Sequence, residues 1–345
     1  MTTAAPQEPK ARRAPVKALA LAAAVVVLAA GVGTWLALRS DGGGSGPSCA
    51  TVGENARIRK DLAPADPKDM NCQELAAALK KAAASDGSGR HTLQQAGVMR
   101  DLVNTLDEDF HNRSKADMAG PLRETVADLL ADYSTDMHTT LVNYGGSAVY
   151  NMKHDGPWRD DKGVVRMPVY SESLTRVMRA VSDDPAAYAT LRKAETARSA
   201  DDLARISRTS AGYALSVPVT DTASVLGLLD GIAEDLLAAR TTSEAARWKG
   251  GVMKGLSDGD ASPVPAYSAD PARYIARTWE RSADGYPALV GQTRDMVGIL
   301  VKASGRSAES VTKPLSQVAD SGQAGKERLN EALINIGASP KGLRT

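Results

Sequence analysis

The chain has 345 residues, of which 43% are hydrophobic but only 4% aromatic, with one phenylalanine, Phe110. A core built from Leu, Val, Ala and Met favours closely packed helices over a β-sandwich, whose strands prefer β-branched and aromatic residues. Lys and Arg number 42 against 41 Asp and Glu, so the net charge of +1 gives no basic excess for nucleic acid and no acidic field for a cationic partner.

The chain begins with two segments that predict a membrane anchor. Residues 1–17 are rich in Ala and Pro with scattered charge, which predicts a disordered cytoplasmic tail. Residues 18–38 are uncharged and apolar, and about 21 helical residues match a ~30 Å hydrocarbon slab. Basic residues are concentrated before this span, so the positive-inside rule keeps the N-terminus in the cytoplasm; they are Lys10, Arg12, Arg13 and Lys17.

A cleavable signal peptide is the alternative interpretation of the same apolar segment. Val27, Leu28 and Ala29 have the small-to-medium size that signal peptidase prefers. The apolar run continues past them through Trp35 to Leu38, which favours the uncleaved anchor. Both interpretations place the remainder of the chain outside the cytoplasm.

The segment after the span predicts a flexible tether and a disulfide. Residues 39–52 contain the run DGGGSGPS and are interpreted as a Gly/Ser-rich linker. The two cysteines of the chain, Cys49 and Cys72, lie at the start of the exported region, where a disulfide is permitted. Closing a loop of about 24 residues contributes ~3 kcal/mol by chain-entropy arguments. Two free thiols are the alternative.

Helical periodicity dominates the exported region. Apolar residues recur at spacings of three and four along several segments, which predicts amphipathic helices. The residues of these stripes are Leu75 and Leu79; Leu93, Val98, Met99, Leu102 and Leu106; Leu122, Val126, Leu129, Leu130 and Tyr133; Leu174, Val177, Met178 and Val181; Val225, Leu226, Leu229, Ile232, Leu236 and Leu237. The sequence predicts an all-α fold, with a helical domain over 53–285 and a C-terminal helical segment over 286–345.

The sequence also predicts the starts of three helices and one connector. Asn71 is a plausible N-cap, and Asp184-Pro185 and Asp270-Pro271 each combine a capping carboxylate with a proline at the first helical position. The alternating run VVRMPVY, 164–170, contains Pro168, so we expect an extended connector and no strand pair.

The usual metal-binding and nucleotide-binding signatures are missing from the sequence. The four histidines, His91, His111, His138 and His154, form no metal-ligand spacing with one another or with cysteine. The phosphate loop of nucleotide-binding proteins is absent as well. We therefore expect no bound cofactor or metal, and no catalytic residues are assigned.

The most polar candidate cluster is Asp132, Asp136 and His138. Two carboxylates four residues apart with a nearby histidine have the chemistry of a metal site. The alternative, which we favour, is a solvated helix face above a buried Tyr133 and Met137, because metal sites draw ligands from several elements. On that interpretation, substituting the three polar residues by Ala changes stability by only ~0.5 kcal/mol each.

Three segments carry a resemblance to a known family. They are LRETVADLLADYSTDMHTTL, SLTRVMRAVSDDPAAYATLRKAETA and SVLGLLDGIAEDLLAARTTSEAARWKGG. Over residues 93–248 the chain resembles an actinobacterial helical family of unknown function, which is found in exported proteins with the architecture of type VII (ESX) secretion substrates and polymorphic toxins. The resemblance implies export and envelope association and supplies no catalytic residue.

These observations predict a single-pass, N-in membrane protein whose extracytoplasmic all-α domain binds a protein or another component of the envelope. Its partners would be the membrane and an envelope protein, with no nucleic acid. One alternative is a substrate or accessory component of an ESX-type secretion system, and another is an extracytoplasmic cell-wall enzyme.

Overall fold

The computed structural model describes residues 47–87, 89–112, 118–143, 156–258 and 262–334. Contacts divide the chain into Met1–Gly43 and a second compact unit, Gly44–Thr345. The predicted tail over 1–17 and membrane span over 18–38 lie outside the described residues, as does 39–46 of the predicted linker.

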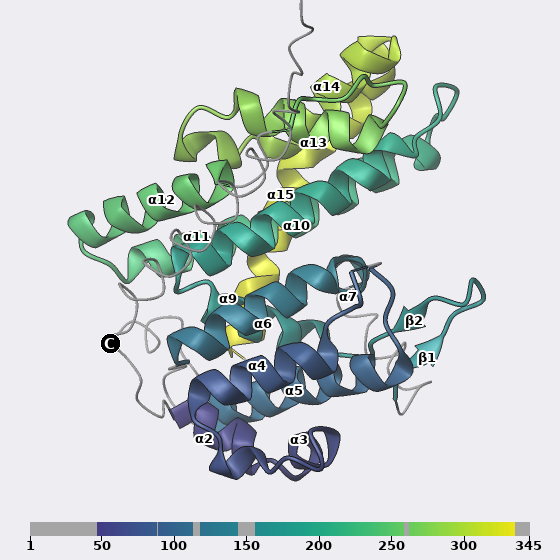
Figure 1. The fold of residues 1–345 in the computed structure, drawn as a ribbon. Coiled ribbons are helices and arrows are strands. Elements are labelled where there is room, and N and C mark those ends of the chain that lie inside the picture. The colour runs from purple at the N-terminus through teal and green to yellow at the C-terminus, as the bar shows by residue number, and fades with distance from the viewer. Residues whose placement is uncertain (1–46, 88, 113–117, 144–155, 259–261, 335–345) are drawn as a thin grey trace, which may run out of the picture. The chain divides into compact units, whose positions relative to one another are not determined.

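The second unit is mostly helical, which confirms the all-α fold class (Figure 1). Its elements in chain order are α2 (Pro47–Glu54), α3 (Ala56–Asp61), η1 (Pro67–Asp69), α4 (Cys72–Ala83), α5 (Leu93–Asn112), α6 (Gly120–Asp132), α7 (Ser134–Val142), β1 (Trp158–Arg159), β2 (Val165–Arg166), α9 (Ser171–Val181), α10 (Pro185–Ala204), α11 (Tyr213–Ala238), α12 (Thr242–Ser257), α13 (Pro271–Ser282), η2 (Tyr286–Leu289), α14 (Gln292–Ser304), η3 (Ala308–Val311) and α15 (Thr312–Ile334).

The predicted apolar stripes form the core. Nearly all of their residues are buried, and the exceptions are Leu93, which is 45% exposed, and the half-buried Leu237. The predicted caps are confirmed as well. Asn71 forms a capping box with Glu74 at the start of α4, and Asp184 and Asp270 cap α10 and α13.

Helix α10 is the element around which the site is built. It packs against α6, α7, α11, α12, α13 and α14, and in Figure 1 it runs through the middle of these helices. Its inner face is buried without exception at Tyr188, Leu191, Arg192, Glu195 and Ser199, so polar and apolar residues share one interior surface.

Helices α11 and α15 pack closely against each other. Gly227 of α11 faces Gly322 of α15, and Gly231 faces Lys326. Residue numbers therefore increase in the same direction along both helices, which means that the two helices run parallel. The described part of the predicted C-terminal segment, 286–334, therefore packs against the preceding helices of the same unit.

The connector over 164–170 differs from the prediction. Val165–Arg166 pairs antiparallel with Trp158–Arg159, in the register Trp158↔Arg166 and Arg159↔Val165. The pairing ends before Pro168, which has no N–H to continue it. A strand of two residues is too short to show a pattern of alternating apolar and polar residues. The expectation of no strand pair was wrong for this reason.

Part of the predicted linker is also helical. Residues 47–52 belong to α2, where the hydroxyl groups of Ser48 and Thr51 donate to Asp109 of α5 at 3.0 and 2.8 Å. Contacts with a residue some sixty positions away order this segment. The segment is rich in small residues such as Ser, Cys and Ala, and its composition alone is therefore similar to that of a linker.

One described helix, α11, is long and apolar enough to cross a membrane when judged by length and composition alone. In its most apolar window 67% of the residues are buried inside the protein, as is common for the core helix of a globular unit.

Candidate functional site

The three polar residues singled out in the sequence do not share one helix face. Helix α6 ends at Asp132, Tyr133 has φ −89° and ψ 23°, and a new helix, α7, begins at Ser134. The break directs Asp132, Asp136 and His138 into three separate networks. Asp136 is only 8% exposed and His138 only 6%, so the solvated-face interpretation is wrong for both residues.

Asp132 closes the connection between α4 and α5. Its carboxylate accepts hydrogen bonds from the backbone N–H of Ser85 at 2.7 Å and the hydroxyl of Ser85 at 2.8 Å. His91 Nε2 lies 3.0 Å away, and the His91 ring stacks on Tyr133 with centroids 3.6 Å apart. Burial raises the pKa of Asp132, but these hydrogen bonds outweigh burial and leave the pKa below its ordinary value.

Asp136 fastens the β1–β2 hairpin to α7. Arg166 Nη1 lies 3.4 Å from Asp136 Oδ1, while Arg166 Nη2 donates to Asp160 at 2.7 Å. Burial raises the pKa of Asp136 to about 6, because the long contact with Arg166 compensates the buried charge only in part.

His138 pairs with two carboxylates of α10. Nδ1 lies 2.6 Å from Glu195 Oε1, and Nε2 lies 3.4 Å from Asp202 Oδ2. Burial lowers the pKa of His138, but attraction to Glu195 and Asp202 outweighs it and raises the pKa above its ordinary value. An acceptor at each ring nitrogen favours the doubly protonated imidazolium.

Glu195 is the fully buried member of this network. Oε1 also accepts a hydrogen bond from Ser199 Oγ at 2.9 Å, while Oε2 has no hydrogen-bond partner within the described part of the chain. A buried carboxylate is costly unless its charge is matched, so the paired His138 is the group that stabilises Glu195 in the core.

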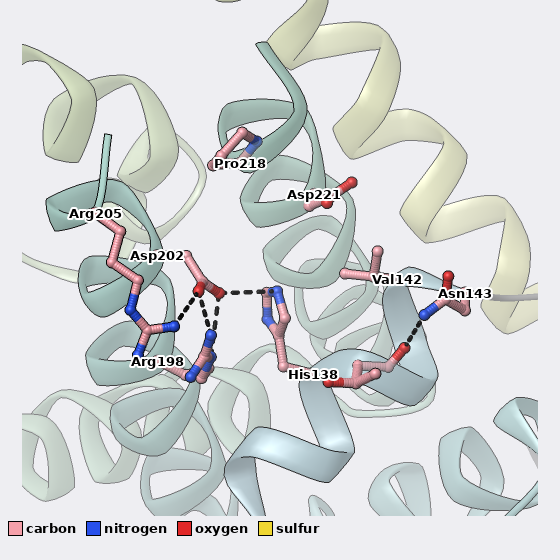
Figure 2. A pocket seen from close by; sticks show the side chains of 9 residues that line it. His138, Val142, Asn143, Arg198, Asp202, Arg205, Pro218 and Asp221 are labelled. Atoms are coloured by element: carbon pink, nitrogen blue, oxygen red, sulfur yellow. Dashed lines mark hydrogen bonds and ion pairs between the residues drawn. The ribbon is translucent and has the colours of Figure 1, made fainter. Parts of the chain in front are cut away.

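A pocket of about 360 Å³ opens beside His138, where α7, α10 and α11 meet (Figure 2). On its α10 side Asp202 is held by two arginines. Arg198 Nε donates to Asp202 Oδ2 at 3.1 Å, and Arg205 Nη1 lies 3.4 Å from Oδ1. Both arginines also bind Asp201, so their charges are already matched.

The α7 and α11 walls of the pocket are different in character. Val142 and Pro218 are apolar, and Thr139, Asn143 and Asp221 are polar. Figure 2 shows Asp221 apart from the ion pairs around Asp202, and no hydrogen bond or ion pair joins it to any described residue. Burial raises the pKa of Asp221, and the nearby Asp202 raises it further, against the opposing charges of His138 and Arg328.

Sequence reasoning found His138 but missed its partners. Glu195, Arg198 and Asp202 follow one another at spacings of three and four along α10, so they share one helix face. That spacing was available in the sequence. Asp221 gave a weaker signal, because it is one of four acidic residues in α11. It lies three positions after Pro218, which cannot donate the usual backbone hydrogen bond.

The predicted cysteine pair lies away from this pocket. Cys49 of α2 and Cys72 of α4 are joined as a disulfide, with Cα atoms 5.5 Å apart. Both side chains are buried, at 5% and 8% exposure, and the bond ties α2 to the beginning of α4.

Among the described residues, no group of three or more His, Cys, Asp or Glu side chains is arranged to hold a metal ion. Comparisons with protein-family models, with curated proteins and with solved structures find no match to this chain. The resemblance to the actinobacterial helical family therefore stays a prediction.

Proposed function

We propose that this chain is a membrane-tethered protein whose helical unit lies outside the cytoplasm and acts by binding a protein of the envelope. The proposed tether is the apolar segment over 18–38, with basic residues ahead of it. A short Gly-rich stretch separates that segment from α2, so the folded unit would stay close to the membrane.

The observation that carries the placement is the Cys49–Cys72 disulfide at the beginning of the folded unit. Structural disulfides persist in oxidising compartments and are rare in the cytosol. With both cysteines of the chain in this bond, no thiol remains to be kept reduced.

Binding is favoured over catalysis by the state of the charged groups at the pocket. His138 is held by carboxylates at both nitrogens, and Arg198 and Arg205 are each held by two aspartates. A general base needs a free nitrogen near its substrate, and a transition-state stabiliser needs uncommitted donors. The pocket instead presents a fixed arrangement of charges, which suits recognition.

The placement is tested with a reporter fused after Thr345. We expect activity from a reporter that works only outside the cytoplasm and none from one that works only inside, because the basic residues precede the span. The matched control removes residues 18–38 and should reverse the two results. Activity of the cytoplasmic reporter on the intact chain would contradict the proposal.

The binding role is tested with a photo-crosslinking residue placed in the full chain in its native membrane. Arg205, 64% exposed at the pocket rim, is one position, and Arg57, 53% exposed on α3, is the matched control. We expect one discrete crosslinked species from Arg205 and none from Arg57. Equal products at both positions would contradict binding through this face.

A further inference from the structure

Asp221 is the acidic pocket residue that has no hydrogen bond or ion pair with any described residue. It projects from α11, while the ion pairs of the pocket gather around Asp202 on α10 (Figure 2). The charged groups that act on Asp221 are His138 of α7, Asp202 of α10 and Arg328 of α15, none of which bonds to it. A half-buried carboxylate without a donor is incompletely solvated, and a ligand that brings a donor would stabilise it.

The neighbouring polar groups on α7 present acceptors. Thr139 Oγ1 donates its proton to the backbone carbonyl of Thr135 at 2.8 Å, so only its lone pairs remain. Asn143 Nδ2 donates one of its two hydrogens to the carbonyl of Thr139 at 2.9 Å, which leaves the amide oxygen as an acceptor and one N–H as a donor. This side of the pocket therefore calls for a ligand that donates hydrogen bonds.

An anionic ligand fits the pocket less well. The guanidinium groups of Arg198 and Arg205 are engaged by Asp201 and Asp202, so an anion would have to break these pairs while lying near Asp221. A cation has no such cost. Val142 and Pro218, in the same lining, offer apolar contact for a short alkyl chain.

We propose that this pocket binds an aliphatic primary ammonium group, with Asp221 as its counter-ion and Asn143 and Thr139 as further acceptors. The group has three donors on a compact charge, which matches three acceptors around an apolar wall. The proposal rests on the proposed binding function, and its ligand is either a free alkylamine or the lysine side chain of a partner polypeptide.

The test is isothermal titration of the purified full-length protein with butylammonium chloride at constant ionic strength. We expect saturable binding of butylammonium and none of butyrate or butanol, which share the alkyl body but lack the ammonium donors. Butyrate binding as tightly as butylammonium, or no butylammonium binding, would overturn the proposal.

Variants identify the counter-ion. Asp221→Asn should weaken butylammonium binding at least ten-fold, whereas Asp295→Asn on α14, an exposed position with the same change of charge, should leave it unchanged. Asp221→Asn should also melt at or above the temperature of the parent protein, since it removes a carboxylate that burial disfavours. Full affinity in Asp221→Asn would overturn the assignment.

A second pair of ligands, a lysine derivative and its Nε-acetylated analogue, distinguishes a free amine from a lysine side chain as the natural ligand. Nα-acetyl-lysine methylamide binding more tightly than butylammonium assigns the site to a polypeptide, and equal affinity assigns it to a free amine; the Nε-acetylated analogue should not bind in either case. Because these titrations use purified protein, their result is independent of the reporter test of topology. A correct topology with no ammonium binding would overturn only this inference.

Discussion

At the scale of single residues, the stretch from Asp132 to His138 shows how a short helix break changes chemistry. On one continuous helix Asp132 and Asp136 would share a face, but the break at Tyr133 separates them. Each polar side chain then meets a different partner, and Tyr133 and Met137, which the sequence placed on the apolar side, are 1% and 0% exposed. Replacing all three polar residues by Ala is therefore expected to destabilise the fold, mainly through loss of the buried His138–Glu195 pair.

Asp136 gives a prediction with a defined pH dependence. Its pKa in the folded protein, about 6, lies above the ordinary 3.8, so ionising it in the folded state becomes costly as the pH rises from 3.8 through 6. Asp136→Asn removes this cost, and its amide oxygen still accepts from Arg166 and the Met167 backbone N–H. At pH 8 the variant should be more stable than the parent by up to about 3 kcal/mol, because each pKa unit corresponds to ~1.4 kcal/mol.

Thermal unfolding by circular dichroism between about pH 3 and pH 8 measures this difference. The advantage of Asp136→Asn should shrink to zero below the ordinary aspartate pKa of 3.8, where the wild-type carboxyl is neutral in both states. A variant less stable than the parent at pH 8 would show that the Arg166 contact stabilises the charged form.

Tyr133 gives a second prediction at this scale. Its hydroxyl donates to the carbonyl of Ala83 at 3.1 Å in the buried contact between α6 and α4. Tyr133→Phe removes the donor and leaves that carbonyl unpaired, which should cost about 1–2 kcal/mol. The control is Tyr213→Phe, because Tyr213 is 86% exposed and its loss of a hydroxyl should not change the free energy of unfolding. Denaturant titration measures both, and equal midpoints would refute the role of the Ala83 bond.

At the scale of elements, glycines set how closely α11 and α15 approach. A Cβ added at Gly227 would lie under 3.0 Å from the backbone of Gly322, and one at Gly325 would meet the backbone of Ser224 and Leu228. Neither clash is with a flexible side chain, so the helices themselves must shift. The absence of side chains here allows the parallel pair to form.

Gly227→Ala and Gly325→Ala should each destabilise the fold by at least ~1–3 kcal/mol through overpacking. Gly298 of α14 supplies the control, since an added Cβ there meets nothing within 4 Å and its backbone is helical. Gly298→Ala should stabilise by roughly 0.5–1 kcal/mol, because alanine loses less conformational entropy in a helix. Thermal melts of the three variants check the contrast, and a neutral Gly227→Ala would refute the close approach.

At the scale of the whole molecule, two cross-links hold distant parts of the chain together. Arg192 of α10 is fully buried and donates to Asp230 of α11 at 2.6 Å, to Gln292 of α14 at 2.7 Å and to the Leu289 carbonyl at 2.8 Å. The other cross-link is the Cys49–Cys72 disulfide near the beginning of the folded unit.

The disulfide closes a loop with a sequence separation of 23, so reducing it should cost ~3 kcal/mol of stability by the chain-entropy argument. We expect a lower melting temperature when the full-length protein is treated with reductant. A Cys49→Ala, Cys72→Ala double variant should melt at the same temperature with and without reductant. Equal labelling of both thiols in non-reduced, denatured protein would show that the bond does not form.

The sequence by itself determined the helical fold class, several helix starts and the buried faces of the periodic segments. The features responsible are the periodic leucines and valines, the N-cap Asn71 and the Asp-Pro pairs. Each acts on residues only a few positions away, so its effect can be predicted from a short stretch of sequence. The pairing of Cys49 with Cys72 was also predictable, because the chain offers no other cysteine.

Only the tertiary structure decided the partners of the buried polar groups. His138 meets Glu195 57 positions away, and Asp136 meets Arg166 30 positions away. The helix break at Tyr133 carries no Gly or Pro to announce it, and the pocket exists only where α7, α10 and α11 converge. Local periodicity indicates which face of a helix is buried. The residue that pairs with a buried charged side chain lies on a distant helix or strand, so it is set by how these elements pack.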